Sequence, residues 1–414
     1  MKFTLIKLAA ACAALLWAFA VTADDAPRIG YVRPLVGTDG FGNVYPGAQV
    51  PFGGIQISPD TDDDYYDAAS GYKYAHKTLM GFSLNHLSGT GIPDLGDFLF
   101  MPGVGEIKLE PGTHDDPDAG YRSRYSHDEE WCSPAYYGVN LTDYGVKAEL
   151  TATERVGFHR YTFPASEEAN LIFNIGTKMG ESGPARDASV TFTEDGRIEG
   201  WVVTEPVYVD IYQKGAVVKM YFSAVVDAEP ASWGAFCGEE VFAGERSRTG
   251  VGAGVYLRFD TRARRDVGVK IGLSYTSVEN ARLNMNTEQP GFDFDKVRPA
   301  ASTMWNKDLS KVQVEGGTKD EKTIFYTGMY HLLIHPNILQ DVNGEYPMME
   351  SLKVGHTTGN RYTVFSLWDT YRNVSTLMTL LYPERQLDII RTMLDMYREN
   401  GWLPKWELYG RETF

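Results

Sequence analysis

The periodicity of the apolar residues changes once along the chain, near Val278, and this change constrains the fold more than any other feature. Before it, short runs rich in β-branched and aromatic residues are bounded by Gly, Asp and Pro, which is typical of strands. Asp195-Gly196 and Lys214-Gly215 are suited to hairpin turns. Closely spaced strands with few helical patterns predict a β-sandwich. The clearest runs are Asn170–Asn174, Val202–Val209, Ala216–Phe222 and Val255–Phe259.

After Val278 the apolar residues recur at helical spacing. We expect Pro299 in the first turn of a short helix that ends near Asp308, followed by a strand over Lys311–Glu315. Thr318 and Glu321 form a capping-box pattern, which predicts the start of a further helix. That helix should stop at Pro336, because proline cannot continue a helix.

Two more helices are expected close to the end of the sequence. One begins at Ser366 and places Leu367, Tyr371, Val374, Met378 and Leu381 on one side. The next begins at Pro383, places Leu387, Ile390, Leu394 and Tyr397 at helical spacing, and stops at Gly401. A linker of about two residues makes an antiparallel helical hairpin, and successive hairpins suggest a bundle or a toroid.

These patterns predict four segments. Residues 1–23 read as a signal peptide, 24–278 as a β-sandwich domain, 279–317 as a linker with a short helix, and 318–414 as the start of a helical domain. We expect this last domain to be incomplete within the 414 residues.

The first residues resemble a secretion signal. Lys2 and Lys7 precede an apolar stretch over 8–21, and Val21-Thr22-Ala23 offers small residues for cleavage. The alternative is a retained membrane anchor, but that stretch is short for a bilayer span, which needs about 20 residues. We therefore expect an exported protein, whether periplasmic, cell-surface or secreted, with no membrane span after cleavage.

The charge balance argues against nucleic acid as a partner. The 39 basic and 55 acidic residues give a formal net charge of −16, and a surface of this sign repels phosphate backbones. After signal cleavage Cys132 and Cys237 remain, and whether they pair is left open. Two cysteines do not make a disulfide framework.

Three stretches combine residue types that suit carbohydrate binding. Trp368 and Asp369 follow Ser366, where they are either a helix start or a sugar contact, with Trp over a ring face and Asp accepting hydroxyls. Trp406 and Glu407 lie in a loop that either anchors helices or recognises sugar. His86 is either a structural histidine or a hydrogen-bonding partner of a sugar hydroxyl.

Two further patterns favour structural interpretations. The stretches 37–42 and 88–96 lack the P-loop pattern of glycines followed by Lys and Ser or Thr, so they are expected to be tight turns in the β-rich half. The acidic run Asp60–Asp64 with Asp67 does not fit an EF-hand, because Tyr65 and Gly71 occupy the positions that need Gly and Glu. A solvated acidic loop is expected there.

Taken together and in order, many of these stretches resemble glycoside hydrolase family 92. The resemblance covers nearly all of the chain after the signal, and the ordered set is far more specific than any one piece. The matching stretches are Val32–Thr38, Tyr45–Gly53, Gln56–Asp60, Gly71–Tyr74, Gly81–Ser83, His86–Gly91, Asp94–Asp97, Arg155–Tyr161, Ser277–Arg282, Tyr362–Thr370 and Gly401–Glu407.

The resemblance implies a β-sandwich packed on an (α/α)6 catalytic barrel, with the active site at their junction. It implies an exo-acting α-mannosidase that inverts configuration, requires a calcium ion and trims terminal mannose from glycans. By the same resemblance, Trp368 and Asp369 become candidate contacts for the terminal mannose. Trp406, Glu407 and His86 are weaker candidates.

The chain also departs from the family pattern. The family's catalytic acid, its base and most of its calcium ligands are expected beyond residue 414, so no catalytic residue or metal ligand is assigned here. We therefore expect this chain alone to be inactive, and poorly soluble because helix faces stay uncovered. The alternative function is a non-catalytic carbohydrate-binding protein. The mannosidic linkage and the oligomeric state stay open.

Overall fold

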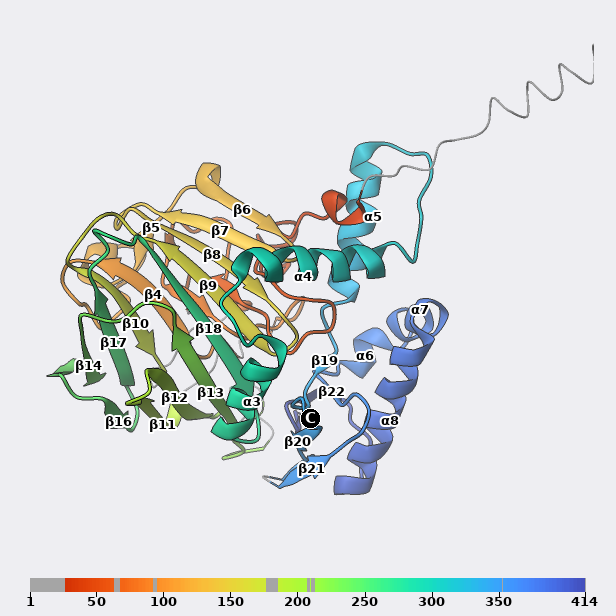
Figure 1. Ribbon diagram of the computed structural model, residues 1–414. Coiled ribbons are helices and arrows are strands. Elements are labelled where there is room, and N and C mark those ends of the chain that lie inside the picture. The colour runs from red at the N-terminus through yellow and green to blue at the C-terminus, as the bar shows by residue number, and fades with distance from the viewer. Residues whose placement is uncertain are drawn as a thin grey trace, which may run out of the picture.

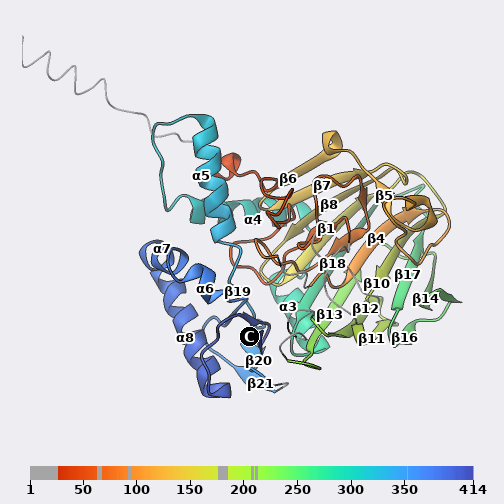
Figure 2. The same ribbon diagram turned by 180° about the vertical axis from the view of Figure 1, so that it is seen from behind.

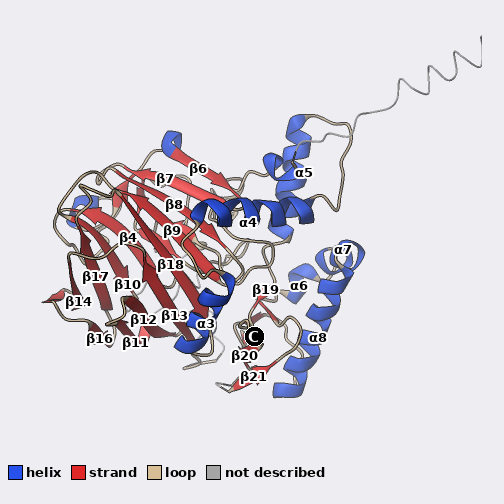
Figure 3. Ribbon diagram, in the orientation of Figure 1, coloured by secondary structure: helices blue, strands red, loops and turns tan. Residues whose placement is uncertain are grey.

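Two antiparallel sheets make up the β-rich half of the protein. The computed structural model describes residues 27–62, 68–91, 95–175, 185–206, 209, 213–351 and 353–413. Strands fill the first part of this range and helices dominate the second (Figures 1 and 3). The predicted succession of a β-rich region and a helical region is therefore confirmed, whereas the predicted signal peptide lies outside the described residues.

The first sheet has the strand order β1-β3-β4-β10-β17-β14-β15. Its strands are β1 (Ser58–Asp60), β3 (Gly81–Ser83), β4 (Leu99–Val104), β10 (Ala169–Asn174), β14 (Ser232–Cys237), β15 (Glu240–Ala243) and β17 (Ala253–Phe259). Figure 2 shows the molecule from the side on which β1 and β4 face the viewer.

The second sheet has the order β16-β11-β12-β13-β18-β9-β8-β7-β6. Its strands are β6 (Glu130–Ser133), β7 (Tyr136–Leu141), β8 (Val146–Ala152), β9 (Val156–Thr162), β11 (Ala185–Phe192), β12 (Arg197–Thr204), β13 (Val218–Val226), β16 (Ser247–Thr249) and β18 (Asp266–Ser274).

The two sheets pack face to face across an aromatic core. Phe173 of the first sheet lies edge-on to Phe222 of the second, with ring centroids 4.8 Å apart. Phe100 and His159 make a similar contact across the sheets at 4.8 Å. Burial of such rings between the inner faces is the main source of stability for a sandwich, at roughly 25 cal/mol per Å² of apolar surface.

One of the two predicted hairpin turns is a tight hairpin. Asp195-Gly196 joins β11 to β12, and Gly196 has a φ of 82°, a conformation that glycine adopts without steric cost. The turn at Lys214-Gly215 lies instead inside a longer connection from β12 to β13. The strand expected over Val202–Val209 begins earlier than predicted, at Arg197, and ends at Thr204.

Smaller elements connect the larger ones. Four two-stranded sheets pair β2 (Thr78–Leu79) with β5 (Ser123–Arg124), β19 (Asn337–Ile338) with β22 (Tyr362–Thr363), β20 (Glu345–Pro347) with β21 (Val354–His356), and β23 (Glu407–Leu408) with β24 (Arg411–Glu412). Short 3-10 helices lie at η1 (Arg28–Tyr31), η2 (Pro117–Ala119) and η3 (His127–Glu129).

Residues 279–317 differ from the predicted linker with one short helix. Helix α3 (Val278–Glu288) packs on β13 and β18, and α4 (Phe294–Leu309) packs on β8 (Figure 1). The helix α4 begins five residues before Pro299, because Asp293 accepts a hydrogen bond from the backbone N–H of Lys296 and caps it. Pro299 therefore lies inside the helix and not in its first turn.

The strand predicted over Lys311–Glu315 does not form. The hydroxyl of Tyr326 donates to the carbonyl of Val312 at 3.0 Å and accepts from the N–H of Val314 at 3.2 Å. A tyrosine side chain therefore satisfies backbone groups that a neighbouring strand would otherwise satisfy.

Helix α5 (Lys319–Leu332) begins as predicted. Thr318 accepts a hydrogen bond from the N–H of Glu321, and the Glu321 carboxylate accepts one from the N–H of Thr318, so the capping box is complete. Tyr326 and Tyr330 are buried on its inner side, whereas Ile324 is exposed.

The helix predicted from Ser366 is broken in two. It consists of α6 (Leu367–Thr370) and α7 (Val374–Leu381), separated by residues 371–373. Asn373, a weak helix former, is the N-cap residue of α7, which favours a new start over continuation. Helix α8 (Pro383–Asn400) follows, with Pro383 at its first position and Gly401 in the left-handed conformation at its end, as predicted.

Helix α8 leaves an apolar stripe exposed. Ile389 and Met396 are buried on its inner side. The exposed stripe consists of Leu387, Ile390, Leu394 and Tyr397, which are 42% to 54% exposed. The uncovered helix face expected from the sequence is therefore present in the structure. The (α/α)6 toroid itself stays a prediction.

Two further expectations concern the cysteines and the membrane. Cys132 and Cys237 are both free thiols, so the structure contains no disulfide between them. Among the described residues, the helices are all too short or too polar to cross a bilayer.

Candidate active site

A pocket of about 310 Å³ lies where the β-rich half meets the helical half. We call it the junction pocket. Backbone and side chains from both halves line it, so its shape depends on how the two halves dock. Its lining residues are Ser88, Gly89, Thr90, His331, Leu332, His335, Pro336, Val364, Phe365, Ser366, Asp369, Thr370, Val374 and Trp406.

The sandwich contributes the loop Ser88-Gly89-Thr90. The N–H of Gly89 donates to the carbonyl of Asn43 at 2.6 Å, and its φ of 76° is in the left-handed region that favours glycine. Part of the second glycine-rich stretch, expected to be only a tight turn, therefore also lines the pocket. Residues 92–94 of that stretch lie outside the described range.

His86 lies behind this loop and not at the pocket surface. Its side chain is fully buried, with Nδ1 2.7 Å from the carbonyl oxygen of Gln56 and Nε2 2.9 Å from Oδ1 of Asp60. His86 is thus held by two contacts inside the sandwich and does not line the pocket. Its partner Asp60 is buried as well, which corrects the expectation that this acidic residue is solvated.

Helix α6 brings Asp369 to the pocket, and Trp368 is its neighbour in that helix. Asp369 lines the pocket and accepts a short hydrogen bond from the hydroxyl of Ser366. The side chain of Trp368 is 57% exposed, which is unusual for so large an apolar group. A carboxylate beside an exposed indole can accept hydroxyl hydrogens while the ring covers an apolar sugar face.

Trp406 and Glu407 occupy different positions, although they are adjacent in sequence. Trp406 lines the pocket and is otherwise buried. The Glu407 carboxylate lies below it, fully buried, and accepts hydrogen bonds from the Gly410 N–H at 2.6 Å, the Thr363 hydroxyl at 3.0 Å and the Val364 N–H at 3.1 Å. Burial raises the pKa of Glu407 to about 7. Glu407 is therefore buried beneath the pocket wall and does not line the pocket.

Two histidines of the pocket were missed by the sequence analysis. His331 is in the last turn of α5 and His335 follows the helix, and burial lowers the pKa of both, to about 4 for His335. Nδ1 of His335 is 3.0 Å from Oδ1 of Asn337. Their i, i+4 spacing in the sequence could have indicated the pair, although His335 lies beyond the end of α5 at Leu332.

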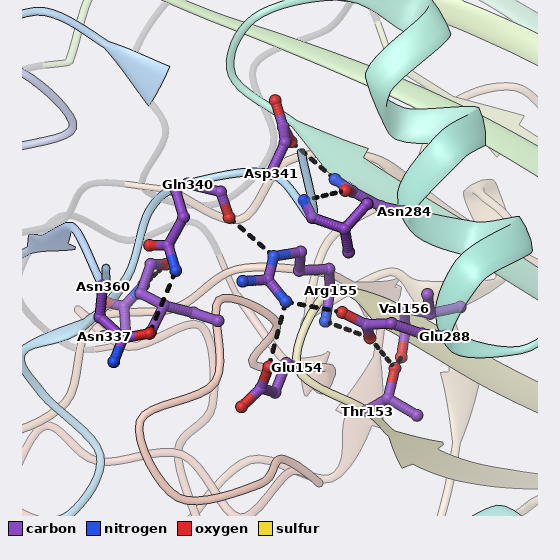
Figure 4. Close-up of polar contacts among 12 residues, drawn as sticks. Thr153, Glu154, Arg155, Val156, Asn284, Glu288, Asn337, Gln340, Asp341 and Asn360 are labelled. Atoms are coloured by element: carbon purple, nitrogen blue, oxygen red, sulfur yellow. Dashed lines mark hydrogen bonds and ion pairs between the residues drawn. The ribbon is translucent and has the colours of Figure 1, made fainter. Parts of the chain in front are cut away.

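Arg155 joins the sandwich to two segments that follow it in the chain (Figure 4). Its Nε donates to the carbonyl of Gln340 at 2.7 Å, and its Nη1 lies 2.8 Å from Oε1 of Glu288 in α3. Close by, the buried Asp341 accepts hydrogen bonds from Asn284 at 2.6 Å and from Thr276 at 2.5 Å. These contacts fix residues 337–341, and with them the strand pair β19 and β22 that leads to α6.

Among the described residues, no three side-chain carboxylates gather into a group that would suit calcium. Calcium takes six to eight oxygen ligands. A single group of at least three metal-ligating side chains is found among the described residues, and it combines Asp62 with His76 and His114. Two imidazole nitrogens do not suit calcium. No catalytic step is therefore derived through that ion.

A pocket between a β-sandwich and a helical region, lined by a tryptophan and a carboxylate, is typical of a carbohydrate-binding site. The family comparisons agree with this class. The description "Glycosyl hydrolase family 92 N-terminal domain" matches residues 31–274, and "Glycosyl hydrolase family 92 catalytic domain" matches residues 280–414. The chain belongs to glycosyl hydrolase family 92.

Solved structures of relatives support this assignment. The family GH92 α-mannosidase BT3965 from Bacteroides thetaiotaomicron is 44% identical, with a TM-score of 0.88 over 94% of this chain and 52% of its own. That protein has also been solved in complex with mannoimidazole. The family GH92 inverting mannosidase BT2199 from Bacteroides thetaiotaomicron is 26% identical, with a TM-score of 0.82 over 94% of this chain and 51% of its own.

A curated relative is similar over a comparable length. An "Uncharacterized secreted glycosidase" of Arthroderma benhamiae is 26% identical over 400 residues, which is 90% of this chain and 46% of that protein. The chain thus spans about half the length of the relatives it matches.

Proposed function

We propose that this chain supplies the mannose-binding part of the active site of an exo-α-mannosidase that inverts configuration. The observation that carries the proposal is the junction pocket, which Asp369 and Trp406 line, with the exposed Trp368 next to Asp369 in the sequence. Membership of glycosyl hydrolase family 92 and similarity to two mannosidases support it. The substrates we propose are glycans with terminal α-linked mannose.

Each pocket residue has a proposed role. The Asp369 carboxylate accepts hydrogen bonds from two sugar hydroxyls, and Trp368 covers an apolar face of the same ring. Trp406 forms part of the pocket wall, and the neutral imidazoles of His331 and His335 orient further hydroxyls. Glu407 and His86 act indirectly, because each is buried and holds a pocket segment in place.

We further propose that the 414-residue chain alone does not hydrolyse mannosides. Inversion needs a proton donor and a water-activating carboxylate about 6.5–9.5 Å apart on opposite sides of the scissile bond. Among the described residues that line the junction pocket, Asp369 is the one carboxylate. Asp369 is therefore assigned to binding, and neither the catalytic acid nor the base is assigned.

Three further points complete the proposal. The helices α5, α7 and α8 form the start of an (α/α)6 catalytic domain, and the exposed stripe of α8 supports this view. The activity requires calcium, on the strength of the family resemblance. The protein is exported, which the signal-like N-terminus and the secreted relative support.

A non-catalytic carbohydrate-binding protein is the second candidate. The observation in its favour is the single carboxylate at the pocket, which suffices to bind a sugar but not to cleave it. The two candidate functions are distinguished by whether the protein from its natural source hydrolyses a bound mannoside or only binds it.

The test is to capture the protein from its natural source with antibodies raised against the recombinant chain, and to assay it on aryl α-mannosides. We expect hydrolysis that a chelator abolishes and calcium restores, with β-mannose as the first product in proton NMR. The recombinant 414-residue chain should show no hydrolysis. Mannoside binding without hydrolysis by the captured protein would favour the binding function, and hydrolysis by the recombinant chain would require a new assignment of the carboxylates.

A further inference from the structure

Three side chains that can ligate a metal meet on the sandwich, outside the junction pocket. Asp62 follows β1, His76 precedes β2, and His114 lies between β4 and η2. Their ligand atoms all lie within 4.8 Å of one another. Because they come from three separate segments, no local spacing in the sequence indicated this group.

The geometry within the group is close to that of a metal site. Nε2 of His114 forms an ion pair with Oδ2 of Asp62. The rings of His76 and His114 have centroids 4.2 Å apart and are tilted by 50° to each other. A nitrogen of each ring can therefore face a shared metal position. The side chains of His114 and Asp62 are 29% and 16% exposed, which leaves the group accessible to an ion and to water.

Threonine hydroxyls lie against the Nδ1 atoms of both histidines. Nδ1 of His76 is 3.0 Å from Oγ1 of Thr61, and Nδ1 of His114 is 3.0 Å from Oγ1 of Thr78. At His76, the Thr61 hydroxyl oxygen can accept the Nδ1 proton, which leaves the lone pair on Nε2. Hydrogen bonds of this kind fix the tautomer and the ring orientation of histidines that bind metals.

Arg122 places a positive charge next to the group. Its Nη1 donates to the carbonyl of Thr61 at 2.7 Å and to the hydroxyl of Thr78 at 2.9 Å, and lies 3.1 Å from Nδ1 of His114. The same charge opposes a second cation, so the affinity should be moderate.

We propose that Asp62, His76 and His114 bind a transition-metal ion of the Zn²⁺ class. Two imidazole nitrogens and one carboxylate suit zinc, and a water molecule would complete the tetrahedron. None of the three residues lines the junction pocket, so this site is separate from the sugar site. The ion would tie together three loops of the sandwich.

The experiment uses the full chain without a histidine tag, titrated with ZnSO₄ by calorimetry in the presence of excess calcium. We expect one zinc ion per chain and an affinity in the micromolar range, with at least tenfold weaker binding in the variants His76→Ala and His114→Ala. The matched control is His356→Ala, a change at an exposed histidine outside the group, which should bind zinc like the wild type.

Cobalt gives a second measurement. Replacement of zinc by Co²⁺ should give visible absorption bands typical of tetrahedral coordination, which the two variants should lack. If an alanine variant fails to fold, as judged by far-UV circular dichroism, Asp62→Asn removes a ligand charge with little change in shape and should also weaken binding tenfold. Absence of zinc binding, or equal weakening in His356→Ala, would overturn the proposal.

Discussion

Arg155 and Glu288 form an ion pair that joins the β8–β9 turn of the sandwich to helix α3, with Nη1 and Oε1 2.8 Å apart. The same guanidinium donates to the carbonyl of Gln340, at the start of the segment that leads to the junction pocket. Both side chains are nearly buried, at 12% and 13% exposure. Arg155 therefore links the β8–β9 turn both to helix α3 and to the segment at Gln340 that leads to the pocket.

The first prediction is that Arg155→Met destabilises the protein by about 2–3 kcal/mol, because it leaves the Glu288 carboxylate and the Gln340 carbonyl without this donor. The loss is measured by urea unfolding. The matched control is Arg124→Met, which breaks ion pairs to Asp118 and Asp143 at the surface and should cost much less. Equal losses of unfolding free energy in the two variants would mean that the contacts of Arg155 do not hold the two halves together.

The second prediction concerns the pH dependence that Glu407 causes. Burial raises its pKa to about 7 in the folded protein, above the 4.5 of an unperturbed glutamate. The native state therefore binds the proton more tightly than the unfolded state, and this contribution to stability is present below pH 4.5 and lost as the pH rises through 7. Glu407→Gln keeps the side chain neutral at every pH.

Between pH 5 and pH 8, the stability of Glu407→Gln relative to the wild type should therefore increase by about 2–3 kcal/mol. Thermal and urea unfolding at several pH values measure it. The exposed Glu129→Gln is the control and should show no such trend. A constant difference between Glu407→Gln and the wild type would show that Glu407 is ionised in both states.

The third prediction concerns the exposed apolar stripe of α8. We expect the 414-residue chain to self-associate and to bind a hydrophobic dye, because contiguous apolar surface is rarely left in contact with water. The double variant Ile390→Lys, Leu394→Lys should sediment more as a monomer and keep its unfolding free energy within about 0.5 kcal/mol. By contrast, Met396→Lys places a charge on the buried side of the same helix and should unfold it. Unchanged association in the double variant would contradict this account.

Much of the local structure was predictable from the sequence. The capping box at Thr318, the proline at the start of α8 and the glycine at its end have local causes, and each is found where it was expected. The strand expected over Lys311–Glu315 is absent for a non-local reason, because Tyr326 from the next helix satisfies its backbone. Contacts of that kind cannot be inferred from apolar periodicity.

The candidate site was predicted in part. Asp369 and Trp406 line one pocket, so the two stretches singled out from composition do meet, and Trp368 is exposed. The burial of His86 and Glu407 could not be anticipated, since the sequence gives residue types but not which side of a loop faces inward. The group of Asp62, His76 and His114 depends on three loops coming together in the sandwich.

The central claim is that the junction pocket binds terminal α-mannose through Asp369 and Trp368. The direct measurement is a calorimetric or NMR titration of the 414-residue chain with methyl α-mannoside, repeated with Asp369→Asn and Trp368→Ala. We predict saturable binding by the wild type, at least tenfold weaker binding in both variants, and no change in Asp395→Asn, which alters an exposed carboxylate on α8. Mannoside binding of equal strength in Asp369→Asn and the wild type would contradict the account.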